Sequence, residues 1–240
     1  MTDRITFLDC EFDPRDTSLA GLLSLGITDN DGHDYYAVHA GADLGALLDH
    51  AFILENVLPH LPVVLSRDPA GTVAAVEWDP HHAHFPHVRT SEQIAADLES
   101  YFSGPDAPRL VCFYGAQDIC RLHSLWNQDW SAMPSGVPTY FTDLRVLADE
   151  LGVKDELPVH DEIDGAVHHA LADARWNRHA YRFLRSLQTA GRVEDIARKL
   201  CAIDHHGMSE VGAWECHRAE QGSYRRAARL LLDAYDMRPR

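Results

Sequence analysis

Two acidic residues separated by one position stand near the start of the chain, in the stretch TFLDCEFDP (6–14). Alternate side chains of a β-strand point to the same face, so Asp9 and Glu11 would stand side by side if this apolar stretch is a strand. Burying two neighbouring carboxylates costs free energy, because they repel each other. A divalent cation between them would offset that cost. The alternative is a strand end that runs into solvent, which the Asp-x-Glu pattern alone favours, because short motifs recur by chance.

Two later segments carry residues that could join this pair. Asp118 follows the apolar stretch RLVCFYG (109–115), and an acid just past the carboxyl end of a strand is a common location for sites on α/β sheets. Asp173 lies in the helical stretch HHALADAR (168–175), whose alanines would let the helix lie close to a sheet. Taken alone, an acid at this position is more often a helix N-terminal residue favoured by the helix dipole than a site residue.

His168 precedes Asp173 by five positions, and this spacing restricts the geometry. Five positions on an α-helix amount to about 500°, which is roughly 140° away from the same face. Both side chains can therefore face one site only if His168 lies in a turn after Gly165, before the regular helix begins. The alternative is a surface histidine, since the chain contains 16 histidines.

The elements expected around these residues are typical of an α/β layer fold. The chain is expected to form strands over 4–10, 21–29, 33–40, 109–115 and 139–144, and helices over 42–61, 90–102, 116–126, 143–152 and 167–187. A turn at 29–32 makes the first three strands an antiparallel meander, and the alternation that follows favours a mixed sheet flanked by helices. The proline-containing segment 62–90 is expected to be irregular, and Gly191 to break the last helix before a helical tail.

Composition restricts the class of protein. The 240 residues suffice for one full domain with an appendage, and no apolar run is long enough to predict a membrane span. Acids occupy the N-terminal region where a signal peptide needs an apolar core, which favours a cytoplasmic protein. The five cysteines are widely spaced, which predicts reduced thiols packed as small hydrophobic side chains.

The formal net charge of −16 argues against a nucleic-acid partner, because phosphate binding usually uses a basic surface. The segment from Thr189 to the C-terminus is nearly neutral, so the excess negative charge lies in the first 188 residues. An acidic protein can still bind phosphate if metal ions supply positive charge at the site.

Four motifs taken in order resemble a known family: FLDCEF, LGITDNDGHDYYAV, FYGAQD and HHALADARWN. Asp-x-Glu on a first strand, a lone Asp after a middle strand and His-x4-Asp on a late helix resemble the signature of the DEDDh 3′→5′ exonucleases. Within them, the motifs are similar to the polyadenylate-specific exoribonuclease AS family of bacteria and phages. The resemblance implies an RNase H-like exonuclease domain over 1–188, with a helical C-terminal extension over 189–240.

The resemblance also assigns roles to residues. Those that match the four metal-binding acids are Asp9, Glu11, Asp118 and Asp173, and His168 matches the general base. The implied cofactors are two Mg²⁺ or Mn²⁺ ions, and the implied products are nucleoside 5′-monophosphates such as AMP, released from a single-stranded RNA 3′ end. Phe12 matches an apolar position near the terminal base. From its position beside Asp173, Arg175 could approach a phosphate.

The expected chemistry agrees with these residue types. A phosphodiester is anionic and resists attack by an anionic nucleophile, and two divalent ions can neutralise it and activate a water. Carboxylate oxygens suit Mg²⁺ or Mn²⁺ better than zinc. An imidazole with a pKa near 6.5 can accept a proton from water around neutral pH.

Other functions remain open at this point. A DEDDh exonuclease could act on DNA, because RNA is distinguished by contacts to the 2′-OH that the sequence does not locate. A non-catalytic RNA- or nucleotide-binding module and a metal-binding scaffold built on the run HHAHFPH (81–87) are further alternatives, although a solvated loop is the favoured interpretation of that run. The amphipathic segment 223–237 is expected to pack on its own domain or on a second subunit, so the sequence allows a homodimer.

Overall fold

The computed structural model describes residues 4–104, 107–160, 166–205 and 207–235. The chain divides into two compact units, unit 1 (Met1–Tyr181) and unit 2 (Arg182–Arg240). The long helix α4 (Ala170–Asp204) contributes residues to both units. Within the described ranges, no helix has the length and apolar character needed to span a membrane. The cytoplasmic location and the functional division at residue 188 stay predictions.

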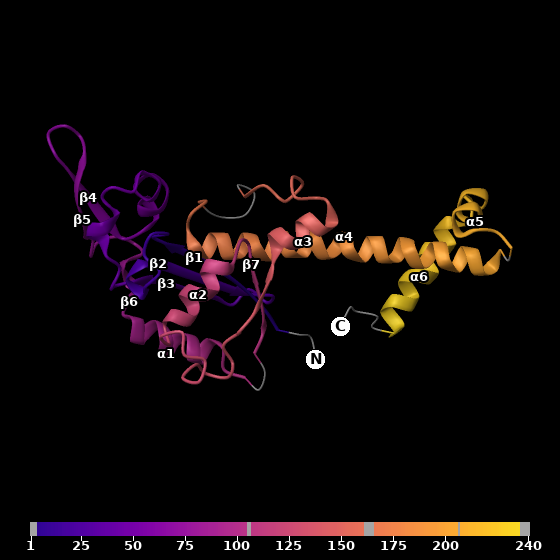
Figure 1. Cartoon of the computed structure of the whole chain (residues 1–240), viewed down its shortest axis with the longest axis horizontal. Coiled ribbons are helices and arrows are strands. Elements are labelled where there is room, and N and C mark those ends of the chain that lie inside the picture. The colour runs from indigo at the N-terminus through magenta and orange to yellow at the C-terminus, as the bar shows by residue number, and fades with distance from the viewer. Residues whose placement is uncertain (1–3, 105–106, 161–165, 206, 236–240) are drawn as a thin grey trace. The chain divides into compact units, whose positions relative to one another are not determined.

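Unit 1 is built on a six-stranded mixed sheet with the strand order β6-β3-β2-β1-β7-β8 (Figure 1). Its strands are β1 (Ile5–Phe12), β2 (Leu22–Asp29), β3 (Asp34–His39), β6 (Val88–Arg89), β7 (Arg109–Cys112) and β8 (Phe141–Asp143). Strands β1, β2 and β3 pair antiparallel, whereas β7 pairs parallel with β1 and β8 pairs parallel with β7. This topology confirms the predicted RNase H-like mixed sheet with its antiparallel meander.

Helices follow the strands largely where the sequence predicts them. Those of unit 1 are α1 (Ser91–Tyr101), α2 (Ala116–Ser124), α3 (Leu144–Leu151) and the first part of α4; those of unit 2 are the rest of α4, α5 (Glu210–Cys216) and α6 (Gln221–Tyr235). The capping box that begins α1 is present, because Thr90 Oγ1 accepts from Gln93 N at 3.3 Å and Gln93 Oε1 accepts from Thr90 N at 2.9 Å.

The sheet is covered on both faces (Figure 1). One face packs against α1 and α2 through a core that includes Leu8 and Leu25 of the central strands. The other face packs against the segment 44–61 and the beginning of α4, in a cluster that includes Val38 and Ala170. Every residue of β2 is buried as a result. The two acids of β1 alternate with the core residues and so face the side covered by α4.

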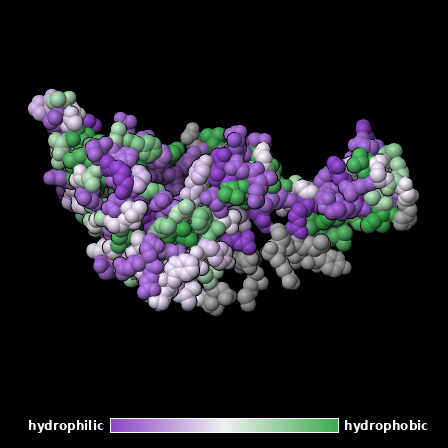
Figure 2. Space-filling view, in the orientation of Figure 1, coloured by the Kyte–Doolittle hydropathy of each residue, from purple (hydrophilic) through white to green (hydrophobic). Residues whose placement is uncertain are grey.

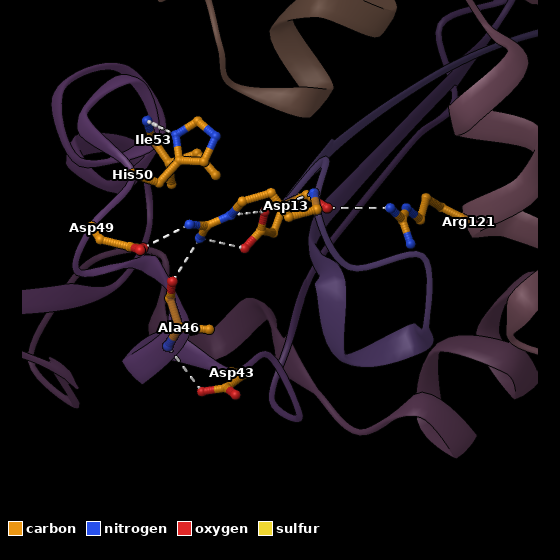
Figure 3. Close-up of polar contacts among 8 residues, drawn as sticks. Asp13, Asp43, Ala46, Asp49, His50, Ile53 and Arg121 are labelled. Atoms are coloured by element: carbon orange, nitrogen blue, oxygen red, sulfur yellow. Dashed lines mark hydrogen bonds and ion pairs between the residues drawn. The ribbon is translucent and has the colours of Figure 1, made fainter.

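The single helix expected over 42–61 is wrong. The segment forms three short helical turns, η2 (Leu44–Leu47), the π-turn η3 (Ile53–Val57) and η4 (Leu58–His60). The carbonyl of Ala46 and the carboxylate of Asp49 both accept hydrogen bonds from the Arg15 guanidinium, at 2.6 Å each. Figure 3 shows Ala46 and Asp49 in this network of polar contacts. Arg15 comes from the loop after β1 and takes a carbonyl that a continuous helix would use.

The irregular segment expected over 62–90 is also wrong in part. It contains an antiparallel hairpin, β4 (Val63–Arg67) and β5 (Val73–Trp78), which forms a second, two-stranded sheet. Pro62 and Pro80 lie beside the outer ends of the hairpin strands, and Pro69 lies in the connecting turn, where Asp68 N donates to Thr72 O at 2.9 Å. Pro86 lies in the short helical turn η5 (Phe85–His87). Proline is tolerated at such positions because no ladder hydrogen bond is lost there.

The helix break expected at Gly191 does not occur, since α4 continues through this residue to Asp204. One helical glycine costs only about 1 kcal/mol. The following residues Val193, Ala197 and Cys201 pack into the core of unit 2, and their burial offsets that cost. All five cysteines are free thiols, as predicted, but Cys120 and Cys216 are exposed rather than packed.

Candidate active site

A cavity of about 450 Å³ in unit 1 brings together most of the predicted site residues. Those that line it are Asp9, Glu11, Phe12, Asp118, His168 and Asp173. They come from strand β1, from the first turn of α2, and from α4 with the turn that precedes it. Segments more than 150 residues apart in the chain therefore meet at one place. Arg175, the remaining candidate, is not among the residues that line this cavity.

Strand β1 and helix α4 approach each other closely because of a glycine. Asp9 is paired with Gly26 of β2 in the antiparallel register. A Cβ atom at Gly26 would lie 2.2 Å from the backbone N of Leu171 and 2.4 Å from the carbonyl O of Ala170. Any side chain at this position would push α4 away from the sheet. Gly26 thus sets the separation between the acids of β1 and Asp173.

Asp118 is fixed to β1 by a hydrogen bond. Its Oδ1 accepts from the backbone N of Cys10 at 2.8 Å, between the two acids of the strand. The parallel pairing of β1 with β7 extends only to Phe7 and Val111, so the two strands have separated by the level of Cys10. Such a crevice at the carboxyl ends of parallel strands is where α/β sheets commonly form sites.

His168 lies outside the regular helix, as the five-residue spacing predicts. Helix α4 begins at Ala170, and His168 has a φ of 66°, in the left-handed region. Its backbone N donates to Asp173 Oδ2 at 3.0 Å, which stabilises this turn. The turn brings side-chain atoms of Glu11, His168 and Asp173 within 4.8 Å of one another. Gly165, at which the helix break was expected, lies outside the described residues.

The carboxyl groups perturb each other strongly. Burial raises the pKa of Asp9 well above its usual value, and repulsion from the neighbouring carboxylates adds to this effect. Burial likewise raises the pKa of Glu11 to about 8, with further repulsion from Asp173 and Asp118. The pKa of Asp118 rises to about 7 through burial, although the hydrogen bond from Cys10 opposes the shift. Such a cluster favours bound cations, and its oxygen donors suit Mg²⁺ or Mn²⁺.

His160 was not identified from the sequence. It lines the same cavity, and its Nε2 contacts Oδ1 of Asp173. Its ring stacks on Trp176, with 5.7 Å between ring centroids, and Trp176 Nε1 donates to Pro158 O at 3.0 Å. The stretch LPVHDEID offers no spacing signal that would have revealed His160.

The two predicted substrate contacts differ in position. Phe12 lines the cavity, and the guanidinium carbon of Arg121 lies 5.0 Å from its ring centroid. Arg175 forms an ion pair instead, with 2.6 Å between its Nη2 and Asp34 Oδ2. Tyr114 and Trp176 add aromatic surface to the cavity wall.

The histidine run 81–87 does not form a ligand cluster. His84 and His87 pack around the ring of Tyr36, at centroid distances of 5.8 and 5.3 Å. Among the described residues, no histidine of this run belongs to a group of three or more side chains placed to hold a metal.

The strand order and pairing of the mixed sheet are those expected of an RNase H-like fold. No protein-family model matches the chain. Two curated proteins of Mycobacterium tuberculosis, from strains CDC 1551 and H37Rv, are each named 3′-5′ exoribonuclease. Each is 31% identical over 188 residues, covering 78% of this chain and 96% of the relative. The chain therefore belongs to this family of 3′-5′ exoribonucleases and is an enzyme.

Solved structures of exonuclease I are also similar to the chain. The apo form has a TM-score of 0.45 at 13% identity, over 85% of this chain and 47% of that one. A product-bound form has a TM-score of 0.43 at 14% identity. The chain spans under half the length of these exonuclease I chains.

Proposed function

We propose that the protein hydrolyses single-stranded RNA from its 3′ end and releases nucleoside 5′-monophosphates. The observation that carries this proposal is the meeting of Asp9, Glu11, Asp118 and Asp173 with His168 in one cavity. The names of the two relatives support RNA as the substrate.

The four carboxylates would hold two Mg²⁺ or Mn²⁺ ions. When bound, these ions supply the positive charge that neutralises the phosphodiester and activates the attacking water. Ligating atoms of Glu11, His168 and Asp173 all lie within 4.8 Å of one another. Asp118 is oriented by the Cys10 amide, so its carboxylate needs little reordering on binding. The pKa values raised by burial and repulsion supply a driving force for cation binding, because bound charge relieves the repulsion.

His168 is the proposed general base, and its imidazole accepts the proton of the attacking water. Its location in a turn gives the ring access to the cavity, while its backbone bond to Asp173 fixes its distance from the acids. His160 also contacts Asp173, but from a loop that packs on Trp176. We assign it a positioning role for Asp173.

The substrate end would stack on the aromatic wall of the cavity. Phe12, Tyr114 and Trp176 offer ring faces, and base stacking tolerates any sequence. This arrangement fits a single-stranded 3′ end, because a duplex holds its bases inside the stack. Purine-rich ends, adenosine-rich tails among them, are the preferred substrates in this proposal, since purines provide the largest stacking area.

The test uses 5′-labelled oligo(A), a mixed-sequence RNA and DNA of the same sequence, each with Mg²⁺ or Mn²⁺. We expect a ladder that shortens from the 3′ end, nucleoside 5′-monophosphate products, and faster cleavage of RNA than of DNA. A 3′-blocked RNA should resist cleavage. Faster cleavage of the DNA would favour the alternative exodeoxyribonuclease. Light scattering tests the homodimer, because one chain has a mass of 26.9 kDa.

A further inference from the structure

A second group of ligating side chains lies in unit 2. It consists of His205, His217 and Glu220, whose ligating atoms all fall within 4.8 Å of one another. Each of the three occupies a helix junction: His205 follows α4 directly, His217 is the C-terminal cap of α5, and Glu220 directly precedes α6. A shared ligand would therefore join all three helices of this unit.

The distances in this group suit a metal better than a hydrogen bond. Glu220 Oε2 lies 3.6 Å from His205 Nε2, and Glu220 Oε1 lies 3.4 Å from His217 Nδ1. Charge-assisted hydrogen bonds are shorter, at about 2.7–2.9 Å. In a tetrahedral zinc site with bonds of about 2.0–2.1 Å, neighbouring ligand atoms are about 3.3–3.4 Å apart. The two imidazole rings already lie 3.4 Å apart, and their 10° interplanar angle has to open for both nitrogens to point at one ion.

Unit 2 also has a structural need for such a link. Its core is small and rich in alanine: Val193, Ala197, Cys201, Ala213, Trp214 and Ala228. Large hydrophobic side chains stay exposed in it, including Ile203 and Leu230, and Figure 2 shows hydrophobic residues at its surface. Domains of this size usually add disulfides or a structural metal. The cysteines are free, so no disulfide supplies that link here.

We propose that His205, His217 and Glu220 form a structural zinc site that ties the ends of the three helices of unit 2 together. Two imidazoles and one carboxylate are a donor set that zinc accepts, with water as the fourth ligand. Tyr224 Oη lies 3.3 Å from His205 Nε2 and donates to Asp204 Oδ2 at 3.0 Å. This fixed hydroxyl can hold the water and orient the site. The residues are separate from those of the candidate active site.

Zinc content tests the proposal on untagged full-length protein, stripped with a chelator and then dialysed against buffered zinc. We expect His217→Gln to retain one zinc fewer per chain than the parent. The matched control is His179→Gln, an exposed histidine outside every group of ligating side chains found among the described residues, and it should leave the zinc content unchanged. Equal zinc in the parent and in His217→Gln would overturn the proposal.

Cobalt spectroscopy separates this site from the carboxylate cavity, because four-coordinate Co²⁺ absorbs visible light far more strongly than six-coordinate Co²⁺ bound by oxygen. We expect strong absorption from the parent and its loss in Glu220→Gln. Glu215→Gln makes the same change at a similarly exposed residue, 56% against 53%, and should keep the absorption. Circular dichroism checks that the variants stay helical. Weak absorption in the parent, or strong absorption in folded Glu220→Gln, would refute the site whatever the nuclease assay shows.

Discussion

The protonation of Glu11 gives a test of the carboxylate cluster that does not depend on activity. Burial and the neighbouring carboxylates raise the pKa of Glu11 to about 8, whereas its unfolded value is 4.5. Between these two values the folded protein binds the proton and the unfolded chain does not. The free energy of unfolding of the metal-free protein must therefore fall as pH rises through this range. The stability that the bound proton of Glu11 contributes is fully lost once the pH exceeds the pKa of Glu11 in the folded protein.

The magnitude follows from the number of protons. One proton bound only in the folded state changes the free energy of unfolding by about 1.4 kcal/mol per pH unit. From pH 6.5 to the Glu11 pKa of about 8, the expected loss is about 2 kcal/mol. The pH range begins at 6.5 because, below this pH, buried histidines change the free energy of unfolding in the opposite direction. Burial lowers the pKa of His169 to about 4, so its contribution rises with pH and is complete above the unfolded value of 6.5.

The measurement is urea unfolding of chelator-treated protein, followed by circular dichroism, at steps between pH 6.5 and 8.5. Glu11 alone accounts for a loss of about 2 kcal/mol, and Asp9 and Asp118, whose pKa values are also raised, add to the loss in the parent. Glu11→Gln should therefore lose less than the parent over the same pH range. Mg²⁺ or Mn²⁺ should restore most of the lost stability in the parent. A flat or rising profile for the metal-free parent, or the same slope in Glu11→Gln, would refute the reasoning.

Three further predictions concern the site and its supports. Asp173→Asn should abolish cleavage while the circular dichroism spectrum stays native. His168→Gln should keep cation binding and lower kcat by about 10²- to 10⁴-fold. A parental rate in His168→Gln would exclude His168 as the general base. Gly26→Ala should destabilise unit 1 by about 3 kcal/mol or more, because the added Cβ meets the backbone of α4 at 2.2 Å. Gly191→Ala should be neutral or stabilising, since nothing lies within 4 Å of the added Cβ. Equal melting temperatures of these two variants would contradict this prediction. Tyr114→Ala, at a 60% exposed residue of the cavity wall, should raise KM for RNA more than it lowers kcat, and an unchanged KM would remove Tyr114 from the substrate path.

Local signals in the sequence predicted the parts of the fold that local physics determines. Strand alternation located Asp9 and Glu11 on one face, and Thr90 with Gln93 marked the start of α1. The angular argument on His168 required only helix geometry, and the structure agrees with it. These features depend on residues within a few positions of one another.

The wrong or missed predictions concern segments whose structure depends on residues far away in the sequence. The segment 42–61 has helical spacing, but Arg15, from another part of the chain, binds its backbone and interrupts it. Gly191 has a low helix propensity, yet packing of later residues carries α4 through it. His160 contacts Asp173 and stacks on Trp176, although 13 and 16 positions separate it from these residues in the sequence. The spacing of residues along the sequence does not predict these contacts.

Anomalous diffraction from crystals grown with Mn²⁺ tests the central claim most directly. We predict two manganese peaks inside the cavity of unit 1, about 3.5–4 Å apart, with carboxylate oxygens of Asp9, Glu11, Asp118 and Asp173 as their ligands. No peak in that cavity at saturating Mn²⁺, or peaks bound by other residues only, would contradict the account.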